Sequence, residues 1–507
     1  MNGLIVGVVG AGTMGEGIAQ VAAAAGHAVL LYDTRAGAAD RAREQVAARL
    51  AKRVVDGKMS GADRDRTLTL ISTRSSLREL APCGLVIEAI VEALDPKRAL
   101  FTELEHTIAP EAILATNTSS LSITALARDL RHRHRFVGLH FFNPVPVMRL
   151  VEIVRGIESS DEVLARLEGL MRSWGKTPVA ARSTPGFIVN RIARPYYAEA
   201  LWLLQERRAT PAQLDECLRG AGFRMGPCEL MDMIGHDVNY AVTESVFAAN
   251  FGDTRFVPSQ VQRELVDAGR LGRKSGRGFY SYDQDNGRSD SFSESPIREA
   301  RVRCILRGEG RLSGTLHEAM AKASIPCERQ QEAGDLQLRL EGNDRTSITL
   351  TCTDGRAAGQ VAAQHGNPAW GLFDWTPAGK LPSSLAVAFA GRCPPSAREL
   401  ALLALRRLGV RPITIADAPG LVVGRTIAML INEAADAVQQ GVCDEAAADT
   451  AMKLGANYPA GPFEWLTHFG ATRIVRLLAH LQGSAHCERY RVSPWLSDRL
   501  WNETAAV

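Results

Sequence analysis

The stretch Leu4-Ile-Val-Gly-Val-Val-Gly-Ala-Gly-Thr-Met-Gly15 decides the fold of the N-terminal part of this chain. It begins with a short apolar run typical of a buried parallel strand, and three spaced glycines follow at once. Residues Glu16 to Ala25 then have the composition of a helix. Strand, glycine turn and helix in this order predict the first unit of a Rossmann-type, doubly wound α/β domain.

The glycines of this turn have separate physical roles. Gly10 permits the tight turn, Gly12 lets the backbone approach a pyrophosphate, and Gly15 lets helix and strand pack closely. Thr13 and Met14 stand where the helix begins, and the free N–H groups of a helix N-terminus point at bound phosphates. The pattern therefore predicts that these five residues bind a dinucleotide.

A second apolar run, Ala28 to Tyr32, ends in Asp33, which lies 18 positions after Gly15. A carboxylate at this place hydrogen-bonds the adenosine ribose hydroxyls and repels a 2′-phosphate. The sequence therefore favours NAD as the cofactor. Arg35 keeps NADP as the alternative, because an arginine beside the ribose accommodates the extra phosphate.

Two further strands are predicted at Leu85 to Ala89 and Ile113 to Thr116. In a doubly wound sheet, ligands bind at the C-terminal ends of the strands. Glu92 and Lys97 follow one strand end and Asn117-Thr-Ser-Ser120 follows the other, so all of them are expected on the cofactor side.

The two serines that end this last segment have different predicted roles. Ser119 is the candidate contact to a substrate hydroxyl. Ser120 has an alternative role, which is to cap the next helix, expected to begin near Leu121.

The stretch from Ala38 to Thr67 is basic and helix-forming, with breaks at Asp56-Gly57 and Ser60-Gly61. These features predict a helical hairpin inserted in the sheet. Two explanations of its charge remain open. The cations form a solvated face, or some of them, including Lys52 and Arg53, bind a phosphorylated carrier such as CoA.

One His and one Glu stand in the otherwise apolar, proline-punctuated segment from Gly138 to Glu152. If Glu152 accepts a hydrogen bond from one ring nitrogen of His140, it orients the ring and leaves the other nitrogen free to take a substrate proton. The segment therefore predicts a general-base dyad. The alternative is a core histidine bonded to a backbone carbonyl, with the glutamate on a solvated edge.

The composition excludes several other classes of protein. The chain has 507 residues, 46% of them hydrophobic and 23% charged, with a net charge of +3, which predicts several soluble globular domains and no nucleic-acid partner. The nine cysteines form no Cys-x-x-Cys pair or His/Cys cluster, so neither disulfides nor a metal site are expected. Because no export signal or long apolar run occurs, we expect a cytoplasmic protein without a membrane partner.

Several motifs taken together resemble the 3-hydroxyacyl-CoA dehydrogenase family, from about Leu4 to Tyr282. The matching segments are the glycine turn, Val86-Ile-Glu-Ala-Ile-Val-Glu92, Asn117-Thr-Ser-Ser120, His140-Phe-Phe-Asn-Pro144, Pro185-Gly-Phe-Ile-Val-Asn-Arg191 and Gly226-Pro-Cys-Glu-Leu230. The resemblance implies NAD-dependent oxidation of an (S)-3-hydroxyacyl-CoA to the 3-oxoacyl-CoA, in β-oxidation of fatty-acid type or in aromatic (phenylacetate) breakdown. Two alternatives remain, a dehydrogenase of free hydroxy acids and a non-catalytic, crystallin-like protein on the same scaffold.

The resemblance also implies a role for each matching residue. His140 is the acid/base with Glu152 as its partner, Ser119 and Asn190 bind the reacting oxygen, and Asn143 supports the site. The positions implied to contact the nucleotide are Asp33, Glu92, Lys97 and, beside them, Asn117.

The second half of the chain partly repeats the first. A shift of 234 carries Gly175 to Gly409 and Pro185-Gly186 to Pro419-Gly420, which predicts a duplicated helical domain. The predicted parts are a Rossmann-type domain (1–184), a helical domain (185–282), a linker (283–296), a degenerate α/β domain (297–408) and a second helical copy (409–507). Long bacterial members of the family, assigned to 3-hydroxybutyryl-CoA or 3-hydroxyadipyl-CoA, are similar in this doubled layout.

The second copy lacks the residues that the chemistry requires. The same shift carries Glu152 to Ala386 and Asn190 to Gly424, and Gly371-Leu-Phe is the only local counterpart of Gly138-Leu-His. We therefore expect one active site per chain. The resemblance implies that the helical domain is a dimerisation element, so we also expect the two helical copies to pack together as an internal pseudo-dimer. The whole protein is then a monomer or a homodimer.

Overall fold

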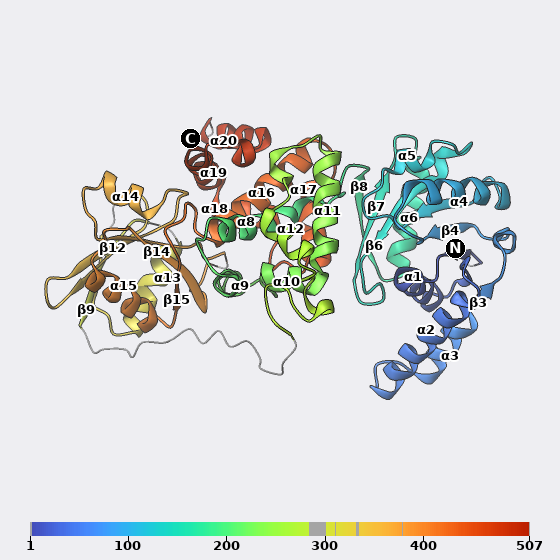
Figure 1. Cartoon of the computed structure of the whole chain (residues 1–507), viewed down its shortest axis with the longest axis horizontal. Coiled ribbons are helices and arrows are strands. Elements are labelled where there is room, and N and C mark those ends of the chain that lie inside the picture. Colours follow the sequence, from blue (N-terminus) through green and yellow to red (C-terminus); the bar gives the residue numbers. More distant parts are fainter. Residues whose placement is uncertain (1–2, 283–300, 310, 331–333, 378, 506–507) are drawn as a thin grey trace. The chain divides into compact units, whose positions relative to one another are not determined.

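The computed structural model describes residues 3–282, 301–309, 311–330, 334–377 and 379–505. The predicted linker, 283–296, lies outside these residues. The chain divides into two compact units. The first comprises Met1–Arg191 together with Gln440–Ala456, and the second comprises Ile192–Gln439 with Asn457–Val507 (Figure 1).

The first unit is built on an eight-stranded sheet with the order β3-β2-β1-β4-β5-β6-β7-β8. Its strands are β1 (Ile5–Val9), β2 (Ala28–Tyr32), β3 (Ile71–Arg74), β4 (Leu85–Glu88), β5 (Ile113–Thr116), β6 (Phe136–Phe141), β7 (Leu150–Arg155) and β8 (Thr177–Arg182). All neighbours are parallel except β6 and β7, which are antiparallel. The predicted doubly wound sheet is confirmed, with an antiparallel pair added at one side.

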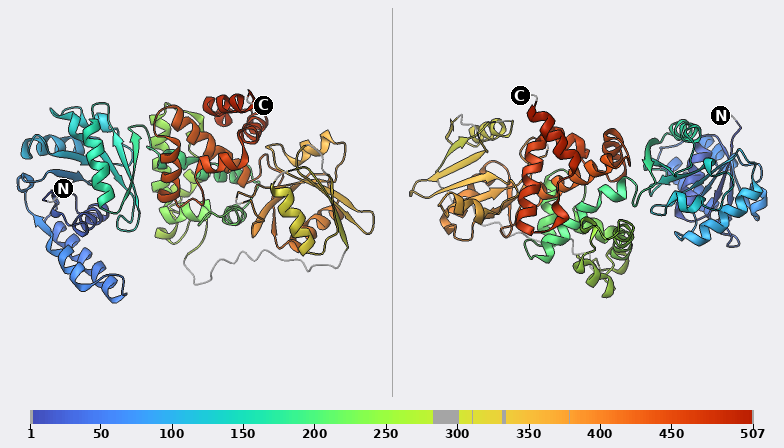
Figure 2. Two further views of the ribbon diagram at one scale, coloured as in Figure 1. Left: turned by 180° about the vertical axis from the view of Figure 1, so that it is seen from behind. Right: turned by 90° about the horizontal axis from the view of Figure 1, so that it is seen from above.

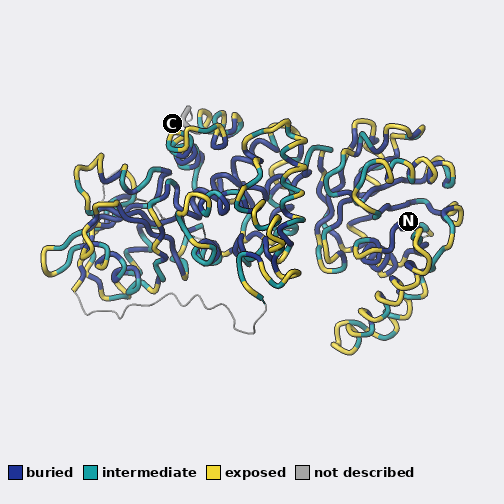
Figure 3. Tube along the Cα trace, viewed as in Figure 1, coloured by how far each residue is buried: buried dark blue, intermediate teal, exposed yellow. Residues whose placement is uncertain are grey.

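Helices cover both faces of this sheet because its strands are apolar on both sides. On one face, α1 (Thr13–Ala24), α2 (Ala38–Val55) and α6 (Asp161–Ser173) contribute to a single apolar core. On the other face, α4 (Leu94–Thr107) and α5 (Ile123–Ala127) pack beneath β6. The central strands β1, β4, β5 and β6 are almost entirely buried and are dark blue in the burial trace of Figure 3.

The predicted basic hairpin is also present. Its second helix, α3 (Gly61–Thr69), begins after Ser60, whose hydroxyl accepts a hydrogen bond from the N–H of Asp63. α2 and α3 contact each other along the hairpin, and Val55 near its tip is 86% exposed. Because only one side of the hairpin is apolar, its cations remain at the surface.

The second unit contains the two helical copies. The first consists of α8 (Arg194–Gln205), α9 (Pro211–Gly220), α10 (Pro227–Ile234), α11 (His236–Ala249) and α12 (Gln260–Asp267). The second contributes α16 (Val423–Gln439), α18 (Pro462–Phe469), α19 (Ala471–Ala485) and α20 (Pro494–Ala505). α8 packs against α16, so the two copies are in contact as expected.

A smaller mixed sheet completes the second unit (Figure 2). Its strand order is β10-β9-β11-β12-β13-β14-β15. Its strands are β9 (Val302–Arg307), β10 (Cys327–Gln330), β11 (Gln337–Gly342), β12 (Ser347–Cys352), β13 (Trp370–Phe373), β14 (Ser384–Phe389) and β15 (Arg411–Thr414). The shift of 234 carries β7 onto β14, so the antiparallel pair β13–β14 corresponds to β6–β7.

Candidate active site

His140 and Glu152 are brought together by strand register. They are direct neighbours across the antiparallel pair β6–β7, so their side chains lie on the same face of the sheet. His140 Nδ1 is 2.5 Å from Glu152 Oε2. Glu152 is fully buried and His140 is 6% exposed. The ring nitrogen is therefore bonded to a carboxylate, and the interpretation with a backbone carbonyl is wrong.

The second oxygen of Glu152 is held by the backbone. Its Oε1 accepts hydrogen bonds from the N–H groups of Ile188, at 3.1 Å, and Val189, at 2.9 Å. These groups lie at the start of α7 (Val189–Ile192), where free N–H groups favour a carboxylate. Asn190 is the next residue of the same turn. Burial of the carboxylate is thus offset by hydrogen bonds on both oxygens.

Aromatic rings border the histidine. The ring centroids of Phe142 and Phe187 lie 4.4 Å and 5.8 Å from that of His140. Apolar neighbours of this kind exclude water and strengthen the electrostatic contact between the ring and the carboxylate.

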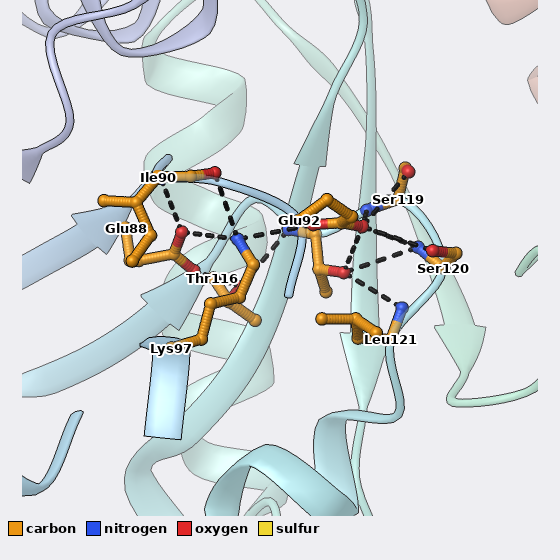
Figure 4. Close-up of polar contacts among 9 residues, drawn as sticks. Glu88, Ile90, Glu92, Lys97, Thr116, Ser119, Ser120 and Leu121 are labelled. Atoms are coloured by element: carbon orange, nitrogen blue, oxygen red, sulfur yellow. Dashed lines mark hydrogen bonds and ion pairs between the residues drawn. The ribbon is translucent and has the colours of Figure 1, made fainter. Parts of the chain in front are cut away.

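A buried charge network lies at the ends of β4 and β5 (Figure 4). Glu88 is fully buried and accepts hydrogen bonds from Lys97 Nζ at 2.5 Å and from Thr116 Oγ1 at 2.6 Å. Lys97 is 1% exposed and also lies 3.3 Å from Glu92 Oε2. Sequence reasoning missed Glu88. The signal was a carboxylate that ends an apolar strand and therefore needs a partner.

Glu92 holds the loop that carries the candidate serines. Its Oε1 accepts hydrogen bonds from Thr118 Oγ1 at 2.6 Å, from the Ser119 N–H at 2.8 Å and from the Ser120 N–H at 3.2 Å. Burial raises the pKa of Glu92, but the Thr118 hydroxyl, the Lys97 charge and the Ser119 N–H outweigh it, so the net pKa is lowered. The carboxylate is therefore anionic and fixes the loop.

The structure corrects one prediction about this loop. The next helix is capped by Ser122, whose hydroxyl accepts a hydrogen bond from the N–H of Ala125. The capping role considered for Ser120 is therefore wrong, because the helix begins two residues later than Leu121, at Ile123. Asn117 Oδ1 accepts a hydrogen bond from the Phe141 N–H at 2.9 Å, which ties the end of β5 to the end of β6.

The glycine turn has the geometry that a dinucleotide requires. A Cβ on Gly10 would lie 2.5 Å from the Ala89 oxygen, and one on Gly15 would lie 1.8 Å from the Gly10 oxygen. A Cβ on Gly12 would meet nothing within 4 Å, so open space lies beside the turn. No side chain caps α1, and Thr13 and Met14 form its first turn. These residues fit a bound pyrophosphate.

Asp33 lies against the same turn. Its Oδ2 accepts a hydrogen bond from the Ala11 N–H at 2.8 Å, and its Oδ1 accepts one from the Arg35 N–H at 2.9 Å. Burial raises the pKa of Asp33, but the Arg35 side chain and the Ala11 N–H outweigh it and lower the net pKa. The residue is thus a negative charge beside the glycines.

The remaining predicted residues lie at the surface. Asn143 is exposed in the turn after β6, and Lys52 and Arg53 are exposed near the end of α2. Within the described residues, no three His, Cys, Asp or Glu side chains are grouped as metal ligands. No helix in this part of the chain is long and apolar enough to cross a bilayer.

The second copy has a different arrangement at the matching position. The N–H of Asp374 donates to the oxygen of Ala386, which corresponds to Glu152. Asp374 therefore has the position in the second copy that His140 has in the first. The correspondence between Phe373 and His140, expected from Gly371-Leu-Phe, is wrong by one residue. Asp374 is fully buried and accepts from the N–H groups of Val422, Val423 and Gly424. It thus holds the matching helix start, as Glu152 does, but without an imidazole.

Comparisons with known proteins agree with this geometry. The family model for the 3-hydroxyacyl-CoA dehydrogenase NAD binding domain matches residues 5–184. The model for the C-terminal domain of the same family matches twice, at 186–282 and 420–504, in agreement with the predicted duplication. A third model, the 3-hydroxybutyryl-CoA dehydrogenase reduced Rossmann-fold domain, matches 350–419.

Individual relatives extend the similarity to the whole chain. The 3-hydroxyadipyl-CoA dehydrogenase of Escherichia coli (strain K12) is 44% identical over 99% of both chains. The crystal structure of 3-hydroxybutyryl-CoA dehydrogenase from Escherichia coli K12 matches with a TM-score of 0.87 and 42% identity over 100% of both chains. The mitochondrial hydroxyacyl-coenzyme A dehydrogenase of Sus scrofa is 40% identical over 55% of this chain and 90% of its own. The chain therefore belongs to the 3-hydroxyacyl-CoA dehydrogenase family and is an NAD-dependent oxidoreductase that acts on 3-hydroxyacyl-CoA.

Proposed function

We propose that His140 is the general acid/base of this reaction and that Glu152 orients it. The 2.5 Å contact between the buried pair carries the proposal. A carboxylate only accepts hydrogen bonds, so His140 carries its proton on Nδ1 and its Nε2 is free. In the oxidative direction Nε2 takes the proton of the substrate hydroxyl, and Glu152 stabilises the imidazolium that forms. When bound, NAD supplies the acceptor for the hydride.

Fixed donors then hold the reacting oxygen. We assign this role to Ser119, whose loop Glu92 clamps, and to Asn190, in the turn that binds Glu152. Asn143 supports the site from the turn after β6.

On the cofactor side, Asn117 and Lys97 shape the nucleotide site through their bonds to Phe141 and Glu88. Positioning of this kind lowers the barrier because the reacting atoms start in line.

We further propose that the substrate is an (S)-3-hydroxyacyl-CoA of a degradative, cytoplasmic β-oxidation route. Two relatives that cover the whole chain carry different substrate names, 3-hydroxyadipyl-CoA and 3-hydroxybutyryl-CoA. Lys52 and Arg53 on the exposed hairpin are the proposed contacts to the CoA phosphates.

Steady-state rates with acetoacetyl-CoA, 3-oxoadipyl-CoA and free acetoacetate, each with NADH, test this proposal. Equal or better turnover of free acetoacetate would exclude the CoA ester as the natural substrate.

The choice of NAD rests on Asp33. Asp33→Ala is expected to raise the KM for NADH roughly 10-fold or more, since a charged hydrogen bond is lost, and to admit NADPH beside Arg35. Initial rates with both cofactors measure the change in preference. Asp40→Ala is the control, because Asp40 is exposed on α2. If the wild-type protein preferred NADPH, Asp33 would not have the proposed role.

One cofactor site per chain follows from the proposed division into an active Rossmann-type domain (1–184) and a degenerate α/β domain (297–408). The second copy has Asp374 in place of the histidine and Ala386 in place of the glutamate. Calorimetric titration with NADH is therefore expected to give one site per chain. A stoichiometry of two would mean that the second α/β domain retains a cofactor site.

A further inference from the structure

A short segment of the C-terminal repeat belongs structurally to the catalytic unit. Gln440–Ala456 lies more than 280 residues after Glu152 in the sequence but is part of the first compact unit. Its helix α17 (Glu445–Gly455) packs on β7, the strand of Glu152, and on the edge strand β8. By sequence the same helix is the second-copy counterpart of α9.

The beginning of this segment is hydrogen-bonded to the elements that surround Glu152. The side-chain oxygen of Gln440 accepts a hydrogen bond from Arg191 Nη1 at 2.9 Å, and Arg191 directly follows Asn190. The Val442 oxygen accepts from the N–H of Arg182, the last residue of β8, at 2.8 Å. The segment is therefore anchored both to the α7 turn and to the sheet.

At the end of the segment, Gly455 lies close to both elements that hold Glu152, strand β7 and the start of α7. A Cβ on Gly455 would lie 2.6 Å from Leu150 Cδ2 and 2.9 Å from Val189 Cγ2. Leu150 is two residues before Glu152 on β7, so the two side chains share a face. Val189 donates its N–H to Glu152. A displacement at Gly455 would therefore reach the catalytic carboxylate from two sides.

Cys443 lies near the beginning of the same segment. Burial raises the pKa of its thiol to about 12, and the charges of Asp444 and Glu152 raise it as well.

The arrangement occurs a second time in the other half of the molecule. There α9 packs on β14 and β15, and the N–H of Ala416 donates to the Arg208 oxygen at 2.9 Å, as Arg182 does to Val442. Gly220 approaches Ser384 on β14 as Gly455 approaches Leu150 on β7. Each helical copy thus places one helix against the sheet of the other copy. Because the same contact of helix and sheet occurs in both halves, we infer that it is a specific contact of this fold.

We infer that Gln440–Ala456 is a positioning segment for the catalytic dyad, so that chemistry in the N-terminal half depends on the C-terminal repeat. The inference rests on the proposed role of Glu152. Gly455 is the residue at which the contact can be tested, because a larger side chain at this position would displace Leu150 or Val189.

Gly455→Val in the full-length protein tests the inference. We expect kcat to fall roughly 10- to 100-fold, because a misplacement of about 1 Å has effects of this size. The KM for NADH should stay within about 2-fold, since the glycine turn and Asp33 lie on other loops. Val189→Ala in the same chain removes the Val189 methyl groups that the new side chain meets but leaves Leu150 Cδ2, so it should restore part of the turnover.

Two further variants keep the test decisive. Gly169→Val is the matched control, because Gly169 lies in helix α6 with nothing within 4 Å of a Cβ, and it should leave kcat unchanged. Gln440→Ala removes only the bond to Arg191 and should lower kcat without changing the melting temperature by more than a few degrees. Wild-type kcat in folded Gly455→Val and Gln440→Ala, or a loss of kcat that Val189→Ala does not reduce at all, would overturn the inference.

Glu152→Gln, measured in parallel, separates this inference from the proposed function. If Glu152→Gln loses turnover while Gly455→Val and Gln440→Ala do not, only the positioning role fails. If Glu152→Gln keeps full turnover, the proposed role of the dyad fails, and the positioning role fails with it.

Discussion

His140→Ala is expected to lower kcat roughly 10²- to 10⁴-fold, the usual contribution of a positioned general base. The affinity for NADH should be nearly unchanged, because the glycine turn and Asp33 hold the nucleotide on other loops. Stopped-flow or steady-state rates with acetoacetyl-CoA and NADH, together with NADH titration by fluorescence, measure the two effects separately. Near-normal turnover would exclude His140 as the acid/base.

Glu152→Gln tests the other half of the dyad. The amide keeps the shape of the side chain but loses the charge that stabilises the imidazolium, so we expect a smaller loss of turnover than in His140→Ala. The backbone N–H groups of Ile188 and Val189 have an oxygen acceptor in both proteins, so folding should be preserved. Unchanged turnover in this variant would assign Glu152 a structural role only.

Glu199→Ala is expected to lower the free energy of unfolding by about 3–5 kcal/mol, the usual cost of removing one partner from a buried ion pair. Glu199 on α8 is fully buried. Its Oε2 lies 2.9 Å from Arg425 Nε on α16, and its Oε1 lies 2.7 Å from Arg489 Nη2. The variant would leave both buried guanidinium groups without this carboxylate.

Chemical unfolding followed by far-UV circular dichroism measures this loss. Glu168→Ala is the control, because Glu168 and Arg172 form an exposed pair on α6, and such pairs contribute at most about 1 kcal/mol. A loss in Glu199→Ala as small as that of the control would show that the interface between the copies does not depend on this network.

The same network predicts an acid sensitivity. Burial raises the pKa of Glu199, but the charges of Arg489 and Arg425 and their hydrogen bonds outweigh it, so the net pKa lies below the ordinary value. A carboxyl whose pKa is lowered on folding stabilises the protein above its unfolded pKa, and that stabilisation is lost as the pH falls through the folded pKa. The stability difference between wild type and Glu199→Ala should therefore shrink in acid.

The ion pairs also show how closely the repeat follows a two-fold relation. The shift of 234 carries Glu199 to Glu433 and Arg255 to Arg489. Glu199 pairs with Arg489, and Glu433 pairs with Arg255, with a nitrogen–oxygen distance of 3.4 Å. Each copy thus supplies the acid for the base of the other, as two subunits do in an isologous dimer.

Several features of this protein were determined by its sequence alone because their signals are local. The strand, glycine turn and helix at Leu4–Ala25 predicted the sheet, since tight turns and phosphate contacts need glycine at set spacings. The segment Thr210-Pro-Ala-Gln213 has the hydroxyl, proline and glutamine that favour a helix start, and the structure has the capping box and the proline there. The segment from Gly138 to Glu152 also predicted the pairing of His140 with Glu152, since buried polar groups need partners. It left a backbone carbonyl as the alternative partner, and the register of β6 and β7 decided between them.

Other features were decided only by the tertiary structure, because they depend on residues far apart in the chain. The periodicity of the sequence does not show that Lys97 is buried between Glu88 and Glu92. A buried charge is stable only beside its partners, and these come together only in the folded sheet. The register of β13 and β14, which gives Asp374 the place of His140, depends on cross-strand bonds that no local pattern specifies. The docking of Gln440–Ala456 on β7 depends on the close approach of Gly455 to Leu150 and Val189, residues that lie far from it in the sequence.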